Sequence, residues 1–116
     1  MKLYRKFEVY KLIAKTPEPP YYAVIFTSIR TDGDNGYCDM AKRMVELASK
    51  QGGFLGAEAA REEVGITVSY WKDLESIRKW KNNSEHSIAR EKGRSDWYKS
   101  FKTRIAKVER DYGFSK

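Results

Sequence analysis

Residues 21–29 read YYAVIFTSI, and this stretch decides which fold the rest of the chain can adopt. Its aromatic and β-branched residues are typical of a β-strand. Apolar side chains occupy both alternating sets of positions, so each face of the strand carries hydrophobic surface. A strand of this kind belongs in the interior of a sheet and needs cover on both sides.

The segments that follow alternate between helical and strand patterns. A turn, TDGDNG, whose Asp34 or Asn35 can cap a helix, precedes an amphipathic pattern that predicts a helix over 37–51. Two stretches with strand character, 54–60 and 66–71, are separated by the turn REEVG. This spacing predicts a β-hairpin.

The last part of the chain predicts one more helix and one more strand. Asp73 is placed to cap a helix over 74–91, which we expect to be broken or bent near Asn83. Apolar anchors separated by charged residues predict a long strand over 97–112. Residues 1–20 form an N-terminal extension, and residues 21–116 form the folded domain.

The resulting order of strand, helix, strand, strand, helix, strand is that of a ferredoxin-like α+β domain. Right-handed crossovers place both helices on one face of a four-stranded antiparallel sheet. The other face then exposes apolar side chains of 21–29, and burying them is worth several kcal/mol at about 25 cal/mol per Å². We expect a homodimer formed face to face by two sheets. The alternative is that residues 1–20 fold over this face of their own subunit.

Composition indicates one globular domain in a reducing compartment. The 116 residues are 41% hydrophobic and 34% charged, which separates the chain from disordered sequences. Cys38 is the only cysteine, so an intrachain disulfide is excluded. No apolar run fits a signal peptide or a membrane-spanning helix. We expect a cytoplasmic protein without a membrane partner.

A formal net charge of +7 raises nucleic acid as a partner. Lysine and arginine are interspersed with acidic residues, however, and form no basic patch in the sequence. The RNA-recognition motif shares the predicted element order and places stacking aromatic residues on its third strand. Ile66 and Val68 stand at those positions here. We therefore expect no nucleic-acid partner.

Six stretches of the chain carry a resemblance to a known family. They are PYYAVIFTS (20–28), GFLGAE (53–58), GITVSYWKD (65–73), WKNNSEH (80–86), GRSDWY (93–98) and VERDYGF (108–114). Together they resemble one bacterial branch of the antibiotic biosynthesis monooxygenase superfamily. The resemblance implies a dimeric α/β barrel, in agreement with the predicted fold and homodimer.

Members of that superfamily include quinone-forming oxygenases without metal or flavin, haem-degrading enzymes and proteins without known activity. The haem-degrading pattern has an asparagine on the first strand, where this chain has Thr27 and Ser28. Its tryptophan and histidine on the second helix are also farther apart than Trp80 and His86, which are six positions apart. Haem is therefore disfavoured as a cofactor. The resemblance implies a cofactor-independent monooxygenase acting on a small hydrophobic or aromatic molecule. The alternative is a non-enzymatic small-ligand binding or stress-related protein on the same scaffold.

Five residues are candidates for the site. Cofactor-free oxygenases hold flat substrates between helices and sheet, and this implies substrate-binding roles for Trp71, Trp80, Thr27 and Ser69. His86 is the only histidine and the candidate catalytic base. The alternatives are that the tryptophans fill the core and that His86 forms only local contacts. One histidine and one cysteine are too few for a zinc site.

Overall fold

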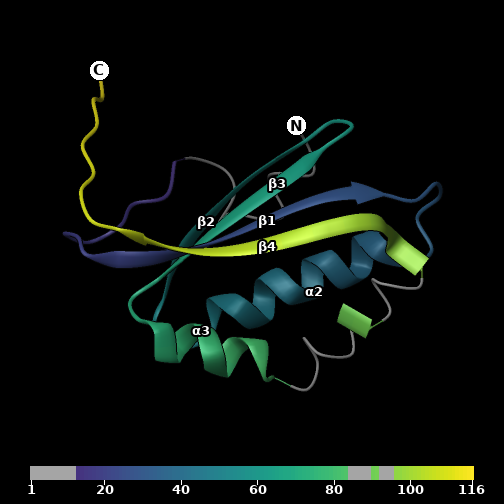
Figure 1. Cartoon of the computed structure of the whole chain (residues 1–116), viewed down its shortest axis with the longest axis horizontal. Coiled ribbons are helices and arrows are strands. Elements are labelled where there is room, and N and C mark those ends of the chain that lie inside the picture. The colour runs from purple at the N-terminus through teal and green to yellow at the C-terminus, as the bar shows by residue number, and fades with distance from the viewer. Residues whose placement is uncertain (1–12, 84–89, 92–95) are drawn as a thin grey trace.

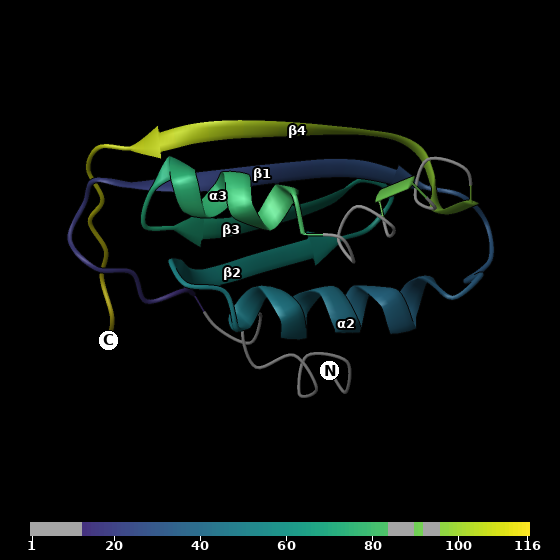
Figure 2. The same ribbon diagram turned by 90° about the horizontal axis from the view of Figure 1, so that it is seen from below.

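The computed structural model describes residues 13–83, 90–91 and 96–116, and its elements follow the order predicted from the sequence. The six elements are β1 (Tyr21–Arg30), α2 (Tyr37–Ser49), β2 (Phe54–Arg61), β3 (Gly65–Trp71), α3 (Leu74–Lys81) and β4 (Tyr98–Val108). The strands form one antiparallel sheet in the order β2-β3-β1-β4. Both helices lie on the same side of it, α2 against β2 and α3 against β3 (Figures 1 and 2). The ferredoxin-like prediction is confirmed.

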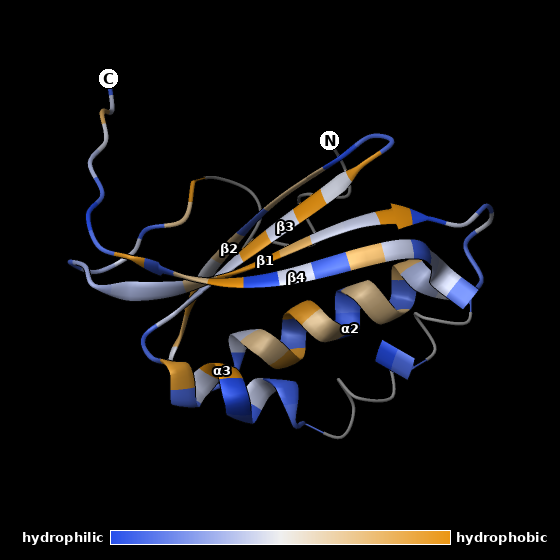
Figure 3. Ribbon diagram, viewed as in Figure 1, coloured by the Kyte–Doolittle hydropathy of each residue, from blue (hydrophilic) through white to orange (hydrophobic). Residues whose placement is uncertain are grey.

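Strand β1 lies inside the sheet, between β3 and β4, as its two apolar faces predict. Hydrophobic residues concentrate on the strands and on α2, whereas the turn between β2 and β3 is hydrophilic (Figure 3). The core joins Trp71 of β3 to Ala48 of α2 and Ile77 of α3. Among the described residues, no helix has the length and apolar character needed to cross a bilayer.

Helix α2 begins at the predicted turn. The Asp34 carboxylate accepts hydrogen bonds from the backbone N–H groups of Gly36 and Cys38, both at 3.1 Å. Asp34 therefore satisfies free N–H groups of the first turn, although Gly36, with φ of 84°, occupies the N-cap position itself. The helix ends at Ser49, two residues before the predicted end at Gln51, because its last turn tightens into three-residue hydrogen bonds.

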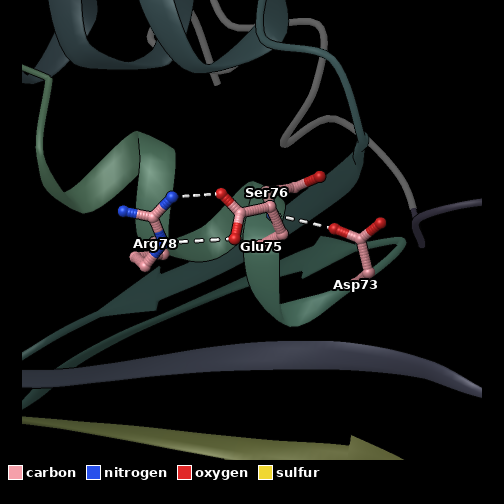
Figure 4. Close-up of polar contacts among 4 residues, drawn as sticks. All are labelled: Asp73, Glu75, Ser76 and Arg78. Atoms are coloured by element: carbon pink, nitrogen blue, oxygen red, sulfur yellow. Dashed lines mark hydrogen bonds and ion pairs between the residues drawn. The ribbon is translucent and has the colours of Figure 1, made fainter.

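Helix α3 is capped by Asp73, as predicted. The Asp73 Oδ1 atom accepts from the backbone N–H of Ser76 at 2.8 Å (Figure 4). Hydrogen bonds from Ser76 lower the pKa of the Asp73 carboxyl below its ordinary value, so the cap stays ionised at neutral pH. On the exposed surface of the helix, Arg78 donates two hydrogen bonds to Glu75 (Figure 4). The bend expected near Asn83 adjoins residues 84–89, which lie outside the described residues.

Strand β4 is shorter than the strand predicted over 97–112. Its last residue, Val108, pairs with Tyr21, and the chain beyond it has left β1, the neighbouring strand in the sheet. At the other end, the Trp97 carbonyl accepts from the Thr31 N–H at 3.0 Å, in the connection that precedes β4. The length of β1 therefore limits the length of β4.

Candidate functional site

The side of the sheet that faces the helices consists of four rows, each with one residue from every strand. Directly paired residues share a face of a sheet, so the strand register defines these rows. In the order β2, β3, β1, β4 they are Phe54, Trp71, Tyr22, Lys107; Ala57, Ser69, Val24, Ile105; Ala59, Thr67, Phe26, Thr103; and Arg61, Gly65, Ser28, Phe101. We call the first the Trp71 row and the last the Arg61 row.

Trp71 brings three of the candidate residues together, because Ser69 of the next row and Trp80 of α3 both contact it. Trp71 is fully buried at 0% exposure, and its Nε1 donates to the Ser69 Oγ at 2.9 Å. Trp80 of α3 stacks on Trp71 with ring centroids 6.1 Å apart and an interplanar angle of 26°. Trp71 therefore serves the core, and half-buried Trp80 is the member of the pair that retains indole surface.

The two middle rows carry short side chains on β2 and β3. Ala57 and Ala59 stand on β2, and Ser69 and Thr67 stand opposite them on β3. Ala57 is buried at 3% exposure, whereas Ala59 and Thr67 are half-buried. On β2 and β3, the two middle rows therefore present only short side chains toward the helices.

Thr27 does not join the other candidates. It stands between Phe26 and Ser28 on β1, so strand alternation directs it to the opposite face of the sheet. There it borders a shallow hollow of about 310 Å³ with Lys102 and Arg104 of β4. Because both alternating sets of β1 are apolar, the sequence pattern did not reveal which hydroxyl faces the helices, and the structure shows that it is Ser28.

His86, the candidate base, falls within residues 84–89 and lies outside the described residues. Its role therefore stays a prediction.

Arg61 is prominent in the structure but was not singled out from the sequence. Its side chain, which remains exposed, crosses over Gly65 and donates a hydrogen bond to the Oγ of Ser28. A Cβ atom at position 65 would collide with the guanidinium group, so a glycine there leaves the path open. Ser28 is 2% exposed. Only the register of three strands reveals this arrangement, and no local sequence signal does.

An aromatic cluster adjoins the Arg61 row and consists of Phe26, Tyr37, Trp97, Tyr98 and Phe101. The Tyr98 ring lies 5.4 Å from Phe26 and 5.7 Å from both Phe101 and Tyr37, measured between centroids. Burial raises the pKa of the Tyr98 phenol above its ordinary value of 10.0, Tyr37 adds to the rise, and the charges of Arg61 and Arg30 oppose it. Tyr98 therefore stays protonated at neutral pH and can donate a hydrogen bond.

The opposite side of the sheet, which we call the outer face, is covered at one end by residues 13–20 of the same chain. The Ala14 N–H donates to Glu58 Oε2 at 2.9 Å, and the Tyr70 hydroxyl donates to Glu58 Oε1 at 2.8 Å. Beside them the Tyr21 hydroxyl donates to Asp111. The N-terminal extension thus covers part of the outer face, as the alternative to a dimer predicted.

The described residues leave apolar side chains exposed at the other end of the outer face. Ile29 is 41% exposed, Ile66 45% and Val64 47%, and all three lie at the end of the sheet away from Tyr21. We call this region the open end of the outer face. Its apolar surface is not buried by residues 13–20.

Comparisons with known sequences agree with the resemblance read from the chain. The family model described as "Antibiotic biosynthesis monooxygenase" matches residues 20–92. A protein of Bacillus subtilis (strain 168), described as uncharacterized protein YqjZ, is 55% identical over 100 residues, which are 84% of this chain and 88% of that protein. The predicted family is confirmed.

Solved structures agree with the fold. SnoaB, a cofactor-independent oxygenase from Streptomyces nogalater, superposes with a TM-score of 0.65 at 10% identity, covering 84% of this chain and 100% of that one. Protein SO0527 from Shewanella oneidensis gives a TM-score of 0.68 at 8% identity, covering 83% and 97%. At such low identity the likeness establishes the fold alone.

Proposed function

Because the chain belongs to the antibiotic biosynthesis monooxygenase family, we propose that it uses molecular oxygen to oxidise a small hydrophobic or aromatic molecule. The observation that carries this proposal is the arrangement of aromatic and short side chains on the helix-facing side of the sheet. Trp80 supplies indole surface near one end, Phe26 and Phe101 supply aromatic surface near the other, and short side chains lie between them. A flat apolar ring fits such a surface.

The proposed reaction converts an activated methylene group into a carbonyl group. A base removes one proton from the methylene carbon, and the resulting carbanion transfers its electrons to dioxygen. One oxygen atom ends in the new carbonyl, and the other leaves as water with the two methylene hydrogens. The substrate supplies all the electrons, so the proposed reaction requires no haem, flavin or metal.

We assign the base to His86, because an imidazole with a pKa of about 6.5 accepts protons near neutral pH. Trp80 would stack on the substrate, and the hydroxyl of Ser69, beside fully buried Trp71, would lie below it. Thr27 is left out of the proposed site, because the strand register directs it to the outer face.

We also propose that two copies associate through the open end of the outer face. Exposed Ile29, Val64 and Ile66 support this, since a contiguous apolar patch on a small protein is typical of an interface. A two-fold axis would bury both copies of the patch at once. Sedimentation should then give about twice the chain mass of 13.5 kDa.

Oxygen uptake with anthrone tests the proposed activity. Anthrone carries an activated methylene group that becomes the carbonyl of anthraquinone. We expect the protein to accelerate uptake above the spontaneous rate, and His86→Ala to lower turnover by about 10² to 10⁴ without changing the unfolding transition. Quenching of tryptophan fluorescence by anthrone without added oxygen uptake would instead support the small-ligand binding alternative.

A further inference from the structure

The Arg61 side chain has unused hydrogen-bonding capacity. A guanidinium group carries five N–H donors, and the hydrogen bond to Ser28 uses one of them. Within residues 13–83, 90–91 and 96–116, no carboxylate forms an ion pair with Arg61; the pair found there joins Arg78 to Glu75. The charge is therefore available to an added anion, and the exposed side chain is accessible to one.

Ser28 and Gly65 hold the guanidinium group in one place. The Ser28 Oγ accepts its hydrogen bond from a position that is 2% exposed, and bare Gly65 lies beneath the group. Arg61 is thus directed along the Arg61 row. An arginine held in this way loses less conformational entropy on binding an anion than a free surface arginine does.

Arg30, the other arginine near the aromatic cluster, uses its guanidinium group in contacts within the chain. Arg30 donates from Nε to the Trp97 carbonyl at 3.0 Å and from Nη2 to the Gly33 carbonyl at 3.1 Å. Its guanidinium carbon also lies 3.6 Å from the centroid of the Tyr37 ring. Arg30 therefore braces the chain around the aromatic cluster, and Arg61 is the arginine with donors left for a ligand.

The surroundings of Arg61 define the rest of the ligand. Phe101 stands in the same row, Phe26 stands in the next row, and their rings lie 5.4 Å apart. The protonated phenol of Tyr98 belongs to the same cluster. A group bound at Arg61 thus meets aromatic surface on β1 and β4, and the short side chains of the middle rows on β2 and β3.

We propose that Arg61, positioned by Ser28 and Gly65, binds the carboxylate of an aromatic carboxylic acid whose ring lies over the middle rows of the helix-facing side. The planar fork of a guanidinium group matches the two oxygens of a carboxylate. The aromatic part of this inference rests on the proposed function, and the anion-binding part rests on Arg61 alone.

Two probes with the same ring system test the inference by calorimetric titration of the full chain. Anthracene-carboxylate carries the anion, and anthracene-methanol is its neutral counterpart. We expect the wild-type protein to bind the carboxylate at least about tenfold more tightly than the alcohol, because hydrogen bonds to charged groups are the stronger ones. Equal affinities would overturn the proposed site.

Two variants separate the charge of Arg61 from its position. Arg61→Gln removes the charge, and Gly65→Ala keeps it but displaces the guanidinium group with the new methyl group. Both should abolish the preference for the carboxylate and leave the affinity for the alcohol within about twofold. Lys42→Gln, an equal loss of charge at an exposed position of α2, should keep the full preference. A preference that survives Arg61→Gln would overturn the inference.

Oxygen uptake with anthrone distinguishes failure of this inference from failure of the proposed function. Uptake by a protein without carboxylate preference would overturn the anion site and leave the monooxygenase proposal standing. A preference that depends on Arg61, in a protein without uptake, would uphold the anion site and overturn the monooxygenase proposal.

Discussion

The two faces of the sheet are both apolar, yet they are covered in different ways. Helices α2 and α3 pack on the helix-facing side at β2 and β3, where Trp71 is buried, whereas Ile105 of the edge strand β4 stays 54% exposed. Exposed Arg61 reaches over the far end of this side. In the part of the chain that the structure describes, residues 13–20 and polar contacts cover one end of the outer face, and Ile66 is exposed at the other end. The comparison separates two roles: we assign ligand binding to the first face and association between copies to the second.

Replacing Trp71 should produce the largest change. The Trp71→Ala variant loses a fully buried ring that contacts both Phe54 and Trp80, so we expect a loss of about 3–5 kcal/mol in the free energy of unfolding. Urea denaturation followed by circular dichroism measures it. Tyr112→Ala, at a fully exposed position, serves as the control and should change little. A loss below about 1 kcal/mol for Trp71→Ala would place the core elsewhere.

A charge on the outer face should separate the proposed dimer. Ile66→Lys places two lysines at a two-fold interface, and we expect the dissociation constant to rise at least about 100-fold. Sedimentation at micromolar concentration should then show the 13.5 kDa chain. Leu74→Lys, at a 53% exposed position on α3, is the matched control and should leave the mass of the wild-type species unchanged. An Ile66→Lys variant that sediments as the wild type does would remove the open end of the outer face from the interface.

Substitutions at two glycines near the edge strand β2 test how tightly each side of the sheet is packed. Gly53 adjoins Ser76 of α3, and Gly56 adjoins Ala14 on the outer face. Both have positive φ, 90° at Gly53 and 151° at Gly56, so alanine at either position costs about 1–3 kcal/mol in backbone strain. Gly53→Ala should be the worse change, because its Cβ would lie 2.7 Å from the Cβ of Ser76 in α3. At Gly56 the nearest atom is the Cβ of Ala14, at 3.1 Å, in a segment without regular structure. Thermal unfolding of both variants tests the order, and a larger loss at Gly56 would contradict it.

Alkaline pH should lower the free energy of unfolding, by less than the substitutions above, through two tyrosines at the covered end of the outer face. Burial and the hydrogen bond to Glu58 raise the pKa of Tyr70 above 10.0, and burial and Asp111 raise that of Tyr21. The folded state then holds these protons more tightly than the unfolded state. Their contribution to stability is complete below about pH 10 and is lost as the pH rises above it.

The free energy of unfolding, measured across this pH range, should therefore fall on the alkaline side. The Glu58→Gln variant removes the carboxylate beside Tyr70 and should show a shallower fall. A slope equal to that of the wild type would show that Glu58 does not hold the Tyr70 proton.

Local patterns in the sequence predicted the elements, because helices and caps depend on neighbouring residues. The Asp73 cap and the amphipathic helix after Asp34 are examples. The site depended on strand register, which joins residues far apart in the chain. The contact between Arg61 and Ser28 spans 33 positions, so no local pattern reveals it. Because β1 is apolar on both faces, its sequence does not show whether Thr27 or Ser28 faces the helices, and the strand register decides this.

Methyl-labelled NMR with bound anthracene-carboxylate tests most directly which face of the sheet holds the ligand. Nuclear Overhauser effects between the ring protons and methyl groups report proximity, and the two faces carry different methyl groups. We predict contacts with Val24 and Ala59, which stand in the middle rows of the helix-facing side. Contacts with Ile25 and Ile66 of the outer face instead would contradict the assignment of ligand binding to the helix-facing side.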